Sequence, residues 1–212
     1  MTVILILALA SLREPIQEPP AKNPPVQQDD KKAAPKQEEK KPEEKKDPYQ
    51  DAIKDMSKKD GVVSVFNKDE TYYFQVPQNI LGRDFLWTTE LKQTPSGMYS
   101  GTMTASSVVR FEQRGEKVLV RTIDYSVRAT EGEEIKFGVE QSNVNPIIKT
   151  FSVKAKSPDG GLLIDVGSWF KGDIPDFSVK QALGGVMIDG ERSFINKVKV
   201  FPTNVNVEVT QT

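Results

Sequence analysis

The stretch "VVRFEQRGEKVLVRTIDYSVRA", residues 108–129, shows the period that governs most of the sequence. Apolar side chains recur at every second position, at Val109 and Phe111 and again at Val118 and Val120. A period of two is typical of a half-buried strand, and "QRGEK" between the two runs supplies turn residues. The stretch therefore predicts a β-hairpin with one face in a core.

The same period continues on both sides of this hairpin, from Gly61 onward. "VVSVF" and "TYYFQV" flank the polar turn "NKDE", "RDFLWTTELKQ" forms another run, and "PDGG" separates "IIKTFSVKAKS" from "GLLIDVGSWF". Short helices are predicted in residues 47–61 and near "EEIKFGVEQS". About nine short strands predict a mainly β fold, an antiparallel β-sandwich or barrel-like domain with one or two short helices.

The final run, "NVNVEVT", predicts a strand over residues 204–210 with an apolar row of valines on one side. Such a row at the end of a sequence predicts a strand at a sheet edge or projecting from the body. One interpretation is therefore a domain truncated at its C-terminal edge. The expected core of the domain consists of Phe85, Trp87, Val109, Phe111, Val118, Val120, Ile123, Leu163, Ile164, Phe170, Phe194 and Val198.

The first 47 residues differ in composition from the rest. Residues 1–13 contain the apolar run "TVILILALA", which is too short for a transmembrane segment and has the length of a secretory signal core. Residues 14–47 are rich in Pro, Lys, Glu and Gln and predict a disordered spacer. The expected domain spans residues 48–212, and the expected localisation is export to the periplasm, the cell surface or the medium.

Composition excludes several classes of function. The net charge of −1 gives no electrostatic basis for nucleic-acid binding. The chain has no Cys and no His, so it lacks thiolate nucleophiles, the usual general base and the usual zinc ligands. We therefore assign no catalytic residue, no metal ligand and no cofactor to this sequence; an enzyme that uses Asp and Lys stays as an alternative.

Two weak signals for chemistry remain. Ser168 and Lys171 have the spacing of a Ser-Lys pair, but that chemistry needs a helix, and the preceding "LLIDV" predicts a strand end or turn. Asp159, Asp173 and Asp176 offer a calcium site or an acid-base pair, although Asp before Gly or Pro is ordinary in turns. Candidate docking residues are Met98 and Tyr99 in a glycine loop and the valines of residues 205–209.

The order of segments resembles a known family. "VFNKDETYYFQVPQNILGRDFLW", "VVRFEQRGEKVLVR", "DVGSWFKGDIPDF" and "RSFINKVKVFPTNVNVEV" are similar to the N-terminal region of exported bacterial zinc-dependent metalloproteases, in which DUF5118 and the start of DUF5117 precede a metzincin-like catalytic part. The resemblance covers residues 49–212. It implies a catalytic "HExxH" helix further along such proteins, which this sequence does not contain, so zinc is expected in that catalytic region and not here.

Two hypotheses of function follow. The first is a noncatalytic N-terminal domain of an exported zinc-dependent metalloprotease, which docks on the catalytic domain of the same or a neighbouring polypeptide, assists it, or binds a protein or peptide substrate. The second is a free-standing exported binding module tethered by the spacer.

Overall fold

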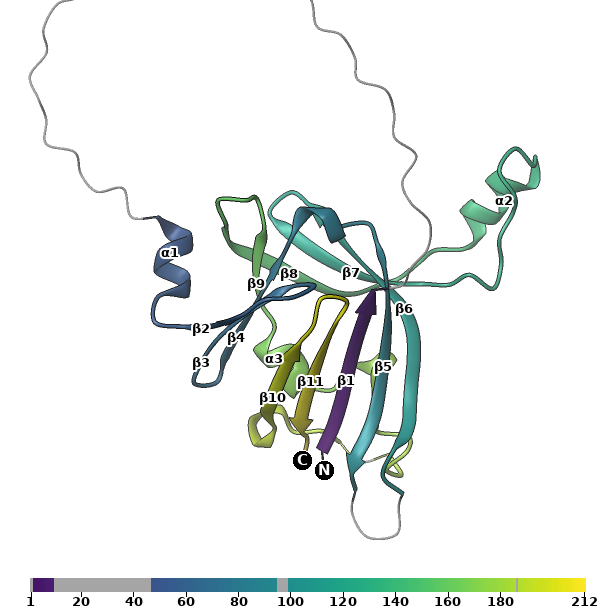
Figure 1. Ribbon diagram of the computed structural model, residues 1–212. Coiled ribbons are helices and arrows are strands. Elements are labelled where there is room, and N and C mark those ends of the chain that lie inside the picture. Colours follow the sequence, from purple (N-terminus) through teal and green to yellow (C-terminus); the bar gives the residue numbers. More distant parts are fainter. Residues whose placement is uncertain (1, 10–46, 95–98, 186) are drawn as a thin grey trace, which may run out of the picture.

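The computed structural model describes residues 2–9, 47–94, 99–185 and 187–212. Within them the chain forms eleven strands, all paired antiparallel, and three short α-helices (Figure 1). The strands are β1 (Thr2–Leu9), β2 (Ser57–Lys59), β3 (Ser64–Lys68), β4 (Thr71–Val76), β5 (Asp84–Gln93), β6 (Thr102–Arg114), β7 (Lys117–Ile123), β8 (Ile147–Lys156), β9 (Leu162–Asp165), β10 (Phe194–Val200) and β11 (Asn204–Thr210). The prediction of a mainly β fold is confirmed.

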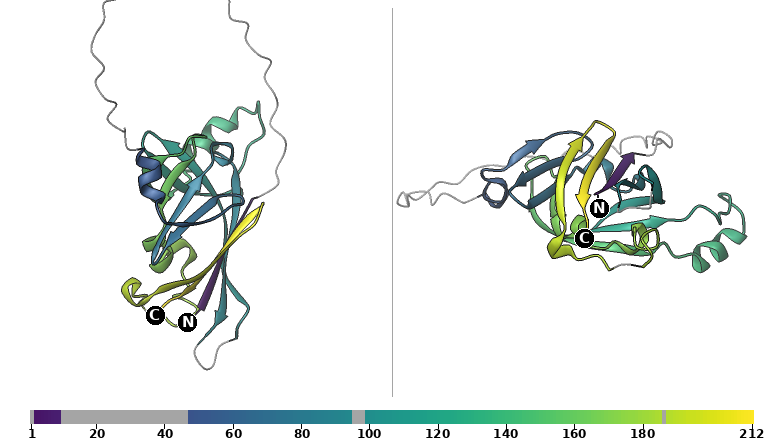
Figure 2. Two further views of the ribbon diagram at one scale, coloured as in Figure 1. Left: turned by 60° about the vertical axis from the view of Figure 1, so that its left-hand side comes forward. Right: turned by 90° about the horizontal axis from the view of Figure 1, so that it is seen from below.

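The strands follow the order β10-β11-β1-β5-β6-β7-β8-β9-β4-β3-β2. They divide into two antiparallel sheets, and the larger one, from β10 to β8, curves like half of a barrel (Figures 1 and 2). The hairpin predicted from residues 108–129 is β6–β7, with Phe111 opposite Val120. The hairpin β3–β4 also forms where the sequence predicts it.

The two ends of this strand order approach each other near Gly61. The Val62 amide donates to the Phe201 carbonyl over 2.8 Å, and the Lys59 Nζ donates to the Val198 carbonyl over 3.0 Å. A Cβ atom on Gly61 would lie 2.4 Å from the Phe201 oxygen, so only glycine allows this approach. The segment before β3 is thereby tied to the β10–β11 hairpin.

An aromatic cluster fills the concave side of the larger sheet. The short helix α3 (Gly167–Lys171) presents Trp169, whose ring lies 4.9 Å from Trp87 of β5 and 5.1 Å from Phe151 of β8. Phe170 contacts Phe74 of β4 with ring centroids 5.5 Å apart. Edge and tilted ring pairs of this kind add stabilisation to the burial of apolar area. Helix α3 therefore joins strands from both sheets through one core.

The predicted core residues are buried, with one exception. Phe194 is 49% exposed, which corrects its placement in the core. The β10–β11 register shifts between Ile195 and Lys197, and such a bulge reverses which side chains face inward. Val198 therefore points into the core, whereas Phe194, four residues earlier, does not, and Ile195 packs against the core in its place.

Residues 204–210 form β11, as predicted, but β11 is not an edge strand. It pairs with β10 on one side and with β1 on the other. The prediction of an edge or projecting strand is therefore wrong. The partner that the sequence did not reveal is the apolar run at residues 2–9, interpreted above as a signal core, which forms β1.

The three helices agree with the helix predictions only in part. Helix α1 (Pro48–Ile53) begins after the Asp47 cap as expected, but it ends well before Gly61 because Asp55 adopts a positive φ of 59° and β2 follows. Helix α2 (Ile135–Ser142) lies where the sequence predicts it. Helix α3 replaces a predicted strand end or turn. No helix in the described ranges combines the length and the apolar character needed to cross a membrane.

Candidate functional site

The Ser-Lys pair lies on a helix after all, but its geometry does not support catalysis. Ser168 and Lys171 are both part of α3, which removes the objection drawn from the sequence. The Lys171 Nζ nevertheless pairs with a carboxylate oxygen of Glu70 at 3.1 Å, and Ser168 is exposed to solvent. The Lys171 ammonium is therefore engaged by Glu70 and not by the Ser168 hydroxyl. The pair is therefore an ordinary surface feature.

The three aspartates do not form one site. Asp159 lies in the β8–β9 turn, where its carboxylate accepts from the Ser157 hydroxyl, and this bond, with a weaker one from the Gly161 amide, holds the pKa of Asp159 below its usual range. Asp173 follows α3 and pairs with Lys180 at 3.3 Å. Among the described residues, no group of three or more acidic side chains is arranged to hold a metal ion.

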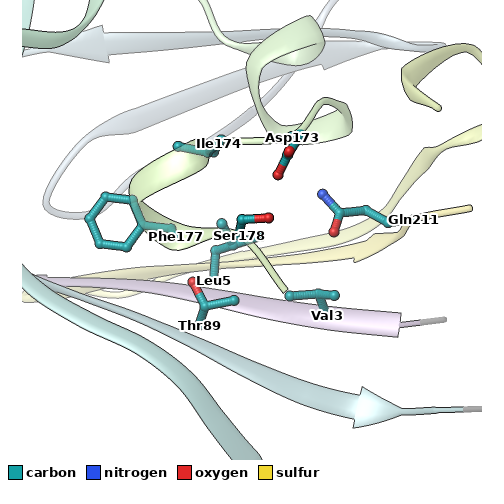
Figure 3. A pocket seen from close by; sticks show the side chains of 8 residues that line it. All are labelled: Val3, Leu5, Thr89, Asp173, Ile174, Phe177, Ser178 and Gln211. Atoms are coloured by element: carbon teal, nitrogen blue, oxygen red, sulfur yellow. The ribbon is translucent and has the colours of Figure 1, made fainter. Parts of the chain in front are cut away.

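A small cavity of about 10 Å³ lies between β1 and the loop after α3 (Figure 3). Asp173 and Ser178 line one side of it, and Val3, Leu5 and Thr89 line the other. The Asp173 Oδ1 atom is buried and accepts no hydrogen bond from the described residues. This volume is about that of one water molecule, so the cavity is too small for a substrate. It shows that side chains do not fill the space beneath β1.

The docking residues proposed from the sequence differ in their exposure to solvent. Val205, Val207 and Val209 are buried at the β1–β11 interface, which excludes them as a free surface in this structure. Tyr99 is 87% exposed before β6, as a docking residue requires. Met98 lies outside the described residues.

A surface that the sequence did not reveal as a docking candidate surrounds α2. Residues 124–146 leave the sheet after β7 and return to β8, and we call this excursion the α2 arm. In Figures 1 and 2 it stands away from the body of the domain. None of the residues of α2 is buried, and the arm exposes several large apolar side chains, of which Ile135 at 65%, Phe137 at 72% and Val144 at 80% are the most exposed. A stable free surface rarely carries such a group of apolar side chains without a partner.

The base of the α2 arm is firmly held. The Asp124 amide donates to the side chain of Asn145 over 3.1 Å, and the Asn145 carbonyl accepts from Arg121 over 2.8 Å. The Tyr125 hydroxyl donates to Asp84, and burial together with this bond raises the pKa of Tyr125. The two ends of the arm are therefore clasped together, so the arm leaves the sheet from a fixed point.

The spacing of the apolar residues in α2 explains why the arm is not packed. Ile135 and Val139 are four residues apart and share one helix face, but Phe137, two residues from each, points to the opposite side. The apolar side chains of α2 therefore do not form a single stripe that could pack on the sheet. Glu131 and Glu140 pair with Lys136 at 2.5 and 3.7 Å and add charge to the same surface. This spacing was the signal available in the sequence.

Two family models match consecutive parts of the chain. The first, Domain of unknown function (DUF5118), matches residues 46–94, and the second, Domain of unknown function (DUF5117), matches residues 101–212. No curated protein and no solved structure gives a significant match. The DUF5117 match spans more than half of the chain, so the chain belongs to the DUF5117 family, with a DUF5118 segment before the DUF5117 segment.

Proposed function

We propose that the chain is a noncatalytic docking domain of an exported zinc-dependent metalloprotease and that the α2 arm is its contact surface. The exposed apolar side chains of the arm, Ile135, Phe137 and Val144, are the observation that carries this proposal. They lie on the α2 arm, outside the core, so burying them in the core is not required for the stability of the fold. Exposed apolar side chains of this kind are typical of a binding surface. The succession of a DUF5118 and a DUF5117 segment supports the metalloprotease context, because it agrees with the order of segments that the sequence resembles.

The partner in this proposal is the zinc-containing catalytic domain of the same or a neighbouring polypeptide, and a protein or peptide substrate is the other candidate. Zinc belongs to that catalytic domain, and this chain contributes no ligand to it. The location of the assembly is outside the cytoplasm, in the periplasm, at the cell surface or in the medium.

A titration of the purified chain against the zinc metallopeptidase domain encoded in the same or a neighbouring gene tests the docking surface. We expect saturable binding that weakens at least about tenfold when Ile135, Phe137 and Val144 are all changed to Ser, because a few buried apolar anchors carry most of the affinity of an interface. Phe201→Ser, which removes an exposed aromatic ring from the β10–β11 turn, is the matched control and should bind like the unchanged chain. Absence of binding, or equal loss in both variants, would contradict the docking role.

A peptidase assay tests the noncatalytic part of the same proposal. The purified chain is expected to cleave no peptide with or without added Zn²⁺. Zinc-dependent cleavage by these 212 residues would overturn the proposal.

A free-standing exported binding module is the second candidate. The observation in its favour is the pairing of β11 on both sides, because the larger sheet then needs no strand from another domain next to β11. In the titration above, this candidate predicts no affinity for the metallopeptidase domain.

A further inference from the structure

Strand β1 occupies a central position in the larger sheet although it comes from the far end of the sequence. It pairs antiparallel with β5 on one side and antiparallel with β11 on the other. Strands β5 and β11 therefore run parallel to each other and are separated by about twice the strand spacing, or roughly 9.6 Å. We call the space between them the β1 slot. Without β1, both of its walls would present a row of unpaired backbone groups.

The inner side of the slot demands apolar side chains. Val3, Leu5 and Leu7 of β1 point into the core and are at most 5% exposed. On the β11 side they lie opposite the buried Val209, Val207 and Val205, and on the β5 side opposite Leu91, Thr89 and Trp87. Positions 3, 5 and 7 of any strand in the slot therefore need apolar residues.

The outer side of the slot is polar, and β1 does not match it. Ile4 lies between Glu208 of β11 and Glu90 of β5. Ile6 lies between Asn206 and Thr88 in the same way. A strand that is buried on one face and solvated on the other normally alternates, as β11 itself does. The walls of the slot thus favour polar residues at positions 4 and 6, where β1 carries isoleucines.

The inner side of β1 also fits incompletely. The cavity of about 10 Å³ beside Asp173 is lined by Val3 and Leu5. A second cavity of about 10 Å³ is lined by Leu5, Leu7, Trp87, Phe170, Val205 and Val207 and contains no polar surface. Two spaces of about the size of a water molecule thus lie along the inner face of this one strand. The side chains of β1 therefore leave space that another strand could fill.

We propose that the β1 slot is a strand-binding site for an extended segment of another polypeptide, and that β1 occupies it in an exchangeable way. The segment runs antiparallel to β5 and β11, is apolar at positions 3, 5 and 7 and is polar or charged at positions 4 and 6. Main-chain hydrogen bonds to both walls supply affinity, and the alternating pockets supply specificity. Residues 1–13 have the pattern of a secretory signal, and their removal would open the slot. This site is separate from the α2 arm, and the inference does not depend on the proposed docking function.

Strand exchange in the folded protein tests this inference directly. A recognition sequence for a site-specific protease is placed between residues 10 and 46 of the full chain, and the folded protein is cut there, so that β1 becomes a bound peptide. Two synthetic peptides of residues 2–9 are then added in excess. The outer-polar peptide carries Ile4→Lys and Ile6→Thr, and the inner-polar peptide carries Leu5→Thr and Leu7→Lys. The two peptides have the same mass and charge, so they differ only in which face is polar.

We expect the outer-polar peptide to replace β1, with one peptide bound per chain in native mass spectrometry. The inner-polar peptide should bind at least about tenfold more weakly, because it would bury a lysine without a partner. The fluorescence of Trp87 and Trp169, the two tryptophans of the chain, reports the slot, since Trp87 lies opposite Leu7. Their emission should stay that of the folded protein with the outer-polar peptide.

Three outcomes would overturn the inference: no exchange with either peptide, equal exchange with both, or an uncut chain that dimerises through β1, which would make a second copy the occupant.

The same substitutions in the intact chain give a second readout that does not require exchange. The chain with Ile4→Lys and Ile6→Thr should unfold in urea at least as late as the unchanged chain. The chain with Leu5→Thr and Leu7→Lys should lose at least about tenfold in its folding equilibrium. A greater loss from the outer pair would contradict the assignment of the polar face.

Discussion

At the scale of single residues, a buried chain of hydrogen bonds fixes α1 on the smaller sheet. The Tyr49 hydroxyl donates to the Gln75 side-chain oxygen over 2.6 Å, and the Gln75 amide donates to the Ser157 hydroxyl over 3.0 Å. Tyr49 and Gln75 are each 7% exposed, and burial raises the pKa of Tyr49. Tyr49 lies within the short helix that the sequence predicts in residues 47–61, but its hydrogen-bond partner is 26 residues away in β4, where no local pattern points to it.

Tyr49→Phe removes one donor from this chain and leaves the Gln75 oxygen buried without a partner. We expect a loss of about 1–3 kcal/mol in the free energy of unfolding, measured by urea denaturation. Tyr73→Phe, in the same strand as Gln75, is the control because Tyr73 is only half buried. Equal losses in the two variants would show that the hydrogen bond does not stabilise the fold.

At the scale of elements, the β8–β9 turn is closed by its own side chains. The Ser157 amide donates to the Gly161 carbonyl over 2.9 Å, and Gly160 adopts a φ of 82° that favours glycine. Asp159 accepts from the Ser157 hydroxyl, which lowers its pKa. A folded-state pKa below the unfolded value gives stability that is present above the unfolded pKa of about 3.9 and is lost as the pH falls through the folded pKa.

The coupling between Ser157 and Asp159 is therefore expected to depend on pH. A double-mutant cycle of Ser157→Ala and Asp159→Asn, followed by urea unfolding, should give a favourable interaction at pH 7 that shrinks toward pH 3. The chain with both substitutions closes the cycle and corrects for the effect of each change alone. An interaction of the same size at both pH values would contradict the assigned role of the carboxylate.

Another element shows where a local pattern fails. The run at residues 2–9 is apolar at nearly every position. Its pattern therefore does not distinguish a signal core from a strand, and it does not show which face of a strand would be buried. Its assignment as β1 depends on β5 and β11, which come from distant parts of the chain. The prediction that residues 1–13 direct export stays a prediction.

At the scale of the whole molecule, the two family segments form one interleaved fold. Strands β4 and β5 come from the first segment, yet β4 pairs with β9 and β5 pairs with β6 of the second segment. The aromatic cluster likewise joins Trp87 of the first segment with Trp169 of the second. A boundary between two sequence families is therefore not a boundary between two folding units.

We expect neither segment to fold alone. Residues 47–99 and residues 100–212, expressed separately, should show poorly dispersed amide signals in NMR spectra and no cooperative urea transition, because each lacks the strands that pair with its own. The full chain is the control and should unfold in a single transition. A well-dispersed spectrum from either segment would show that the interleaving is not required for folding.

The local features of this protein follow from its sequence alone. The period of two identifies the hairpins β3–β4 and β6–β7, the extent of β11 and nearly all of the core, because alternation and turn residues act over a few neighbouring positions. The absence of His and Cys likewise limits the chemistry open to the chain, whatever its fold.

Features that depend on partners far apart in the chain are set by the tertiary structure. It places β1 beside β11, exposes Phe194 through a bulge and leaves the α2 arm outside the core. These features escape a local pattern because a strand is completed by hydrogen bonds to its neighbours, and the packing of the whole sheet selects those neighbours. A valine row that looks like an open edge in the sequence is therefore an interior strand in the fold.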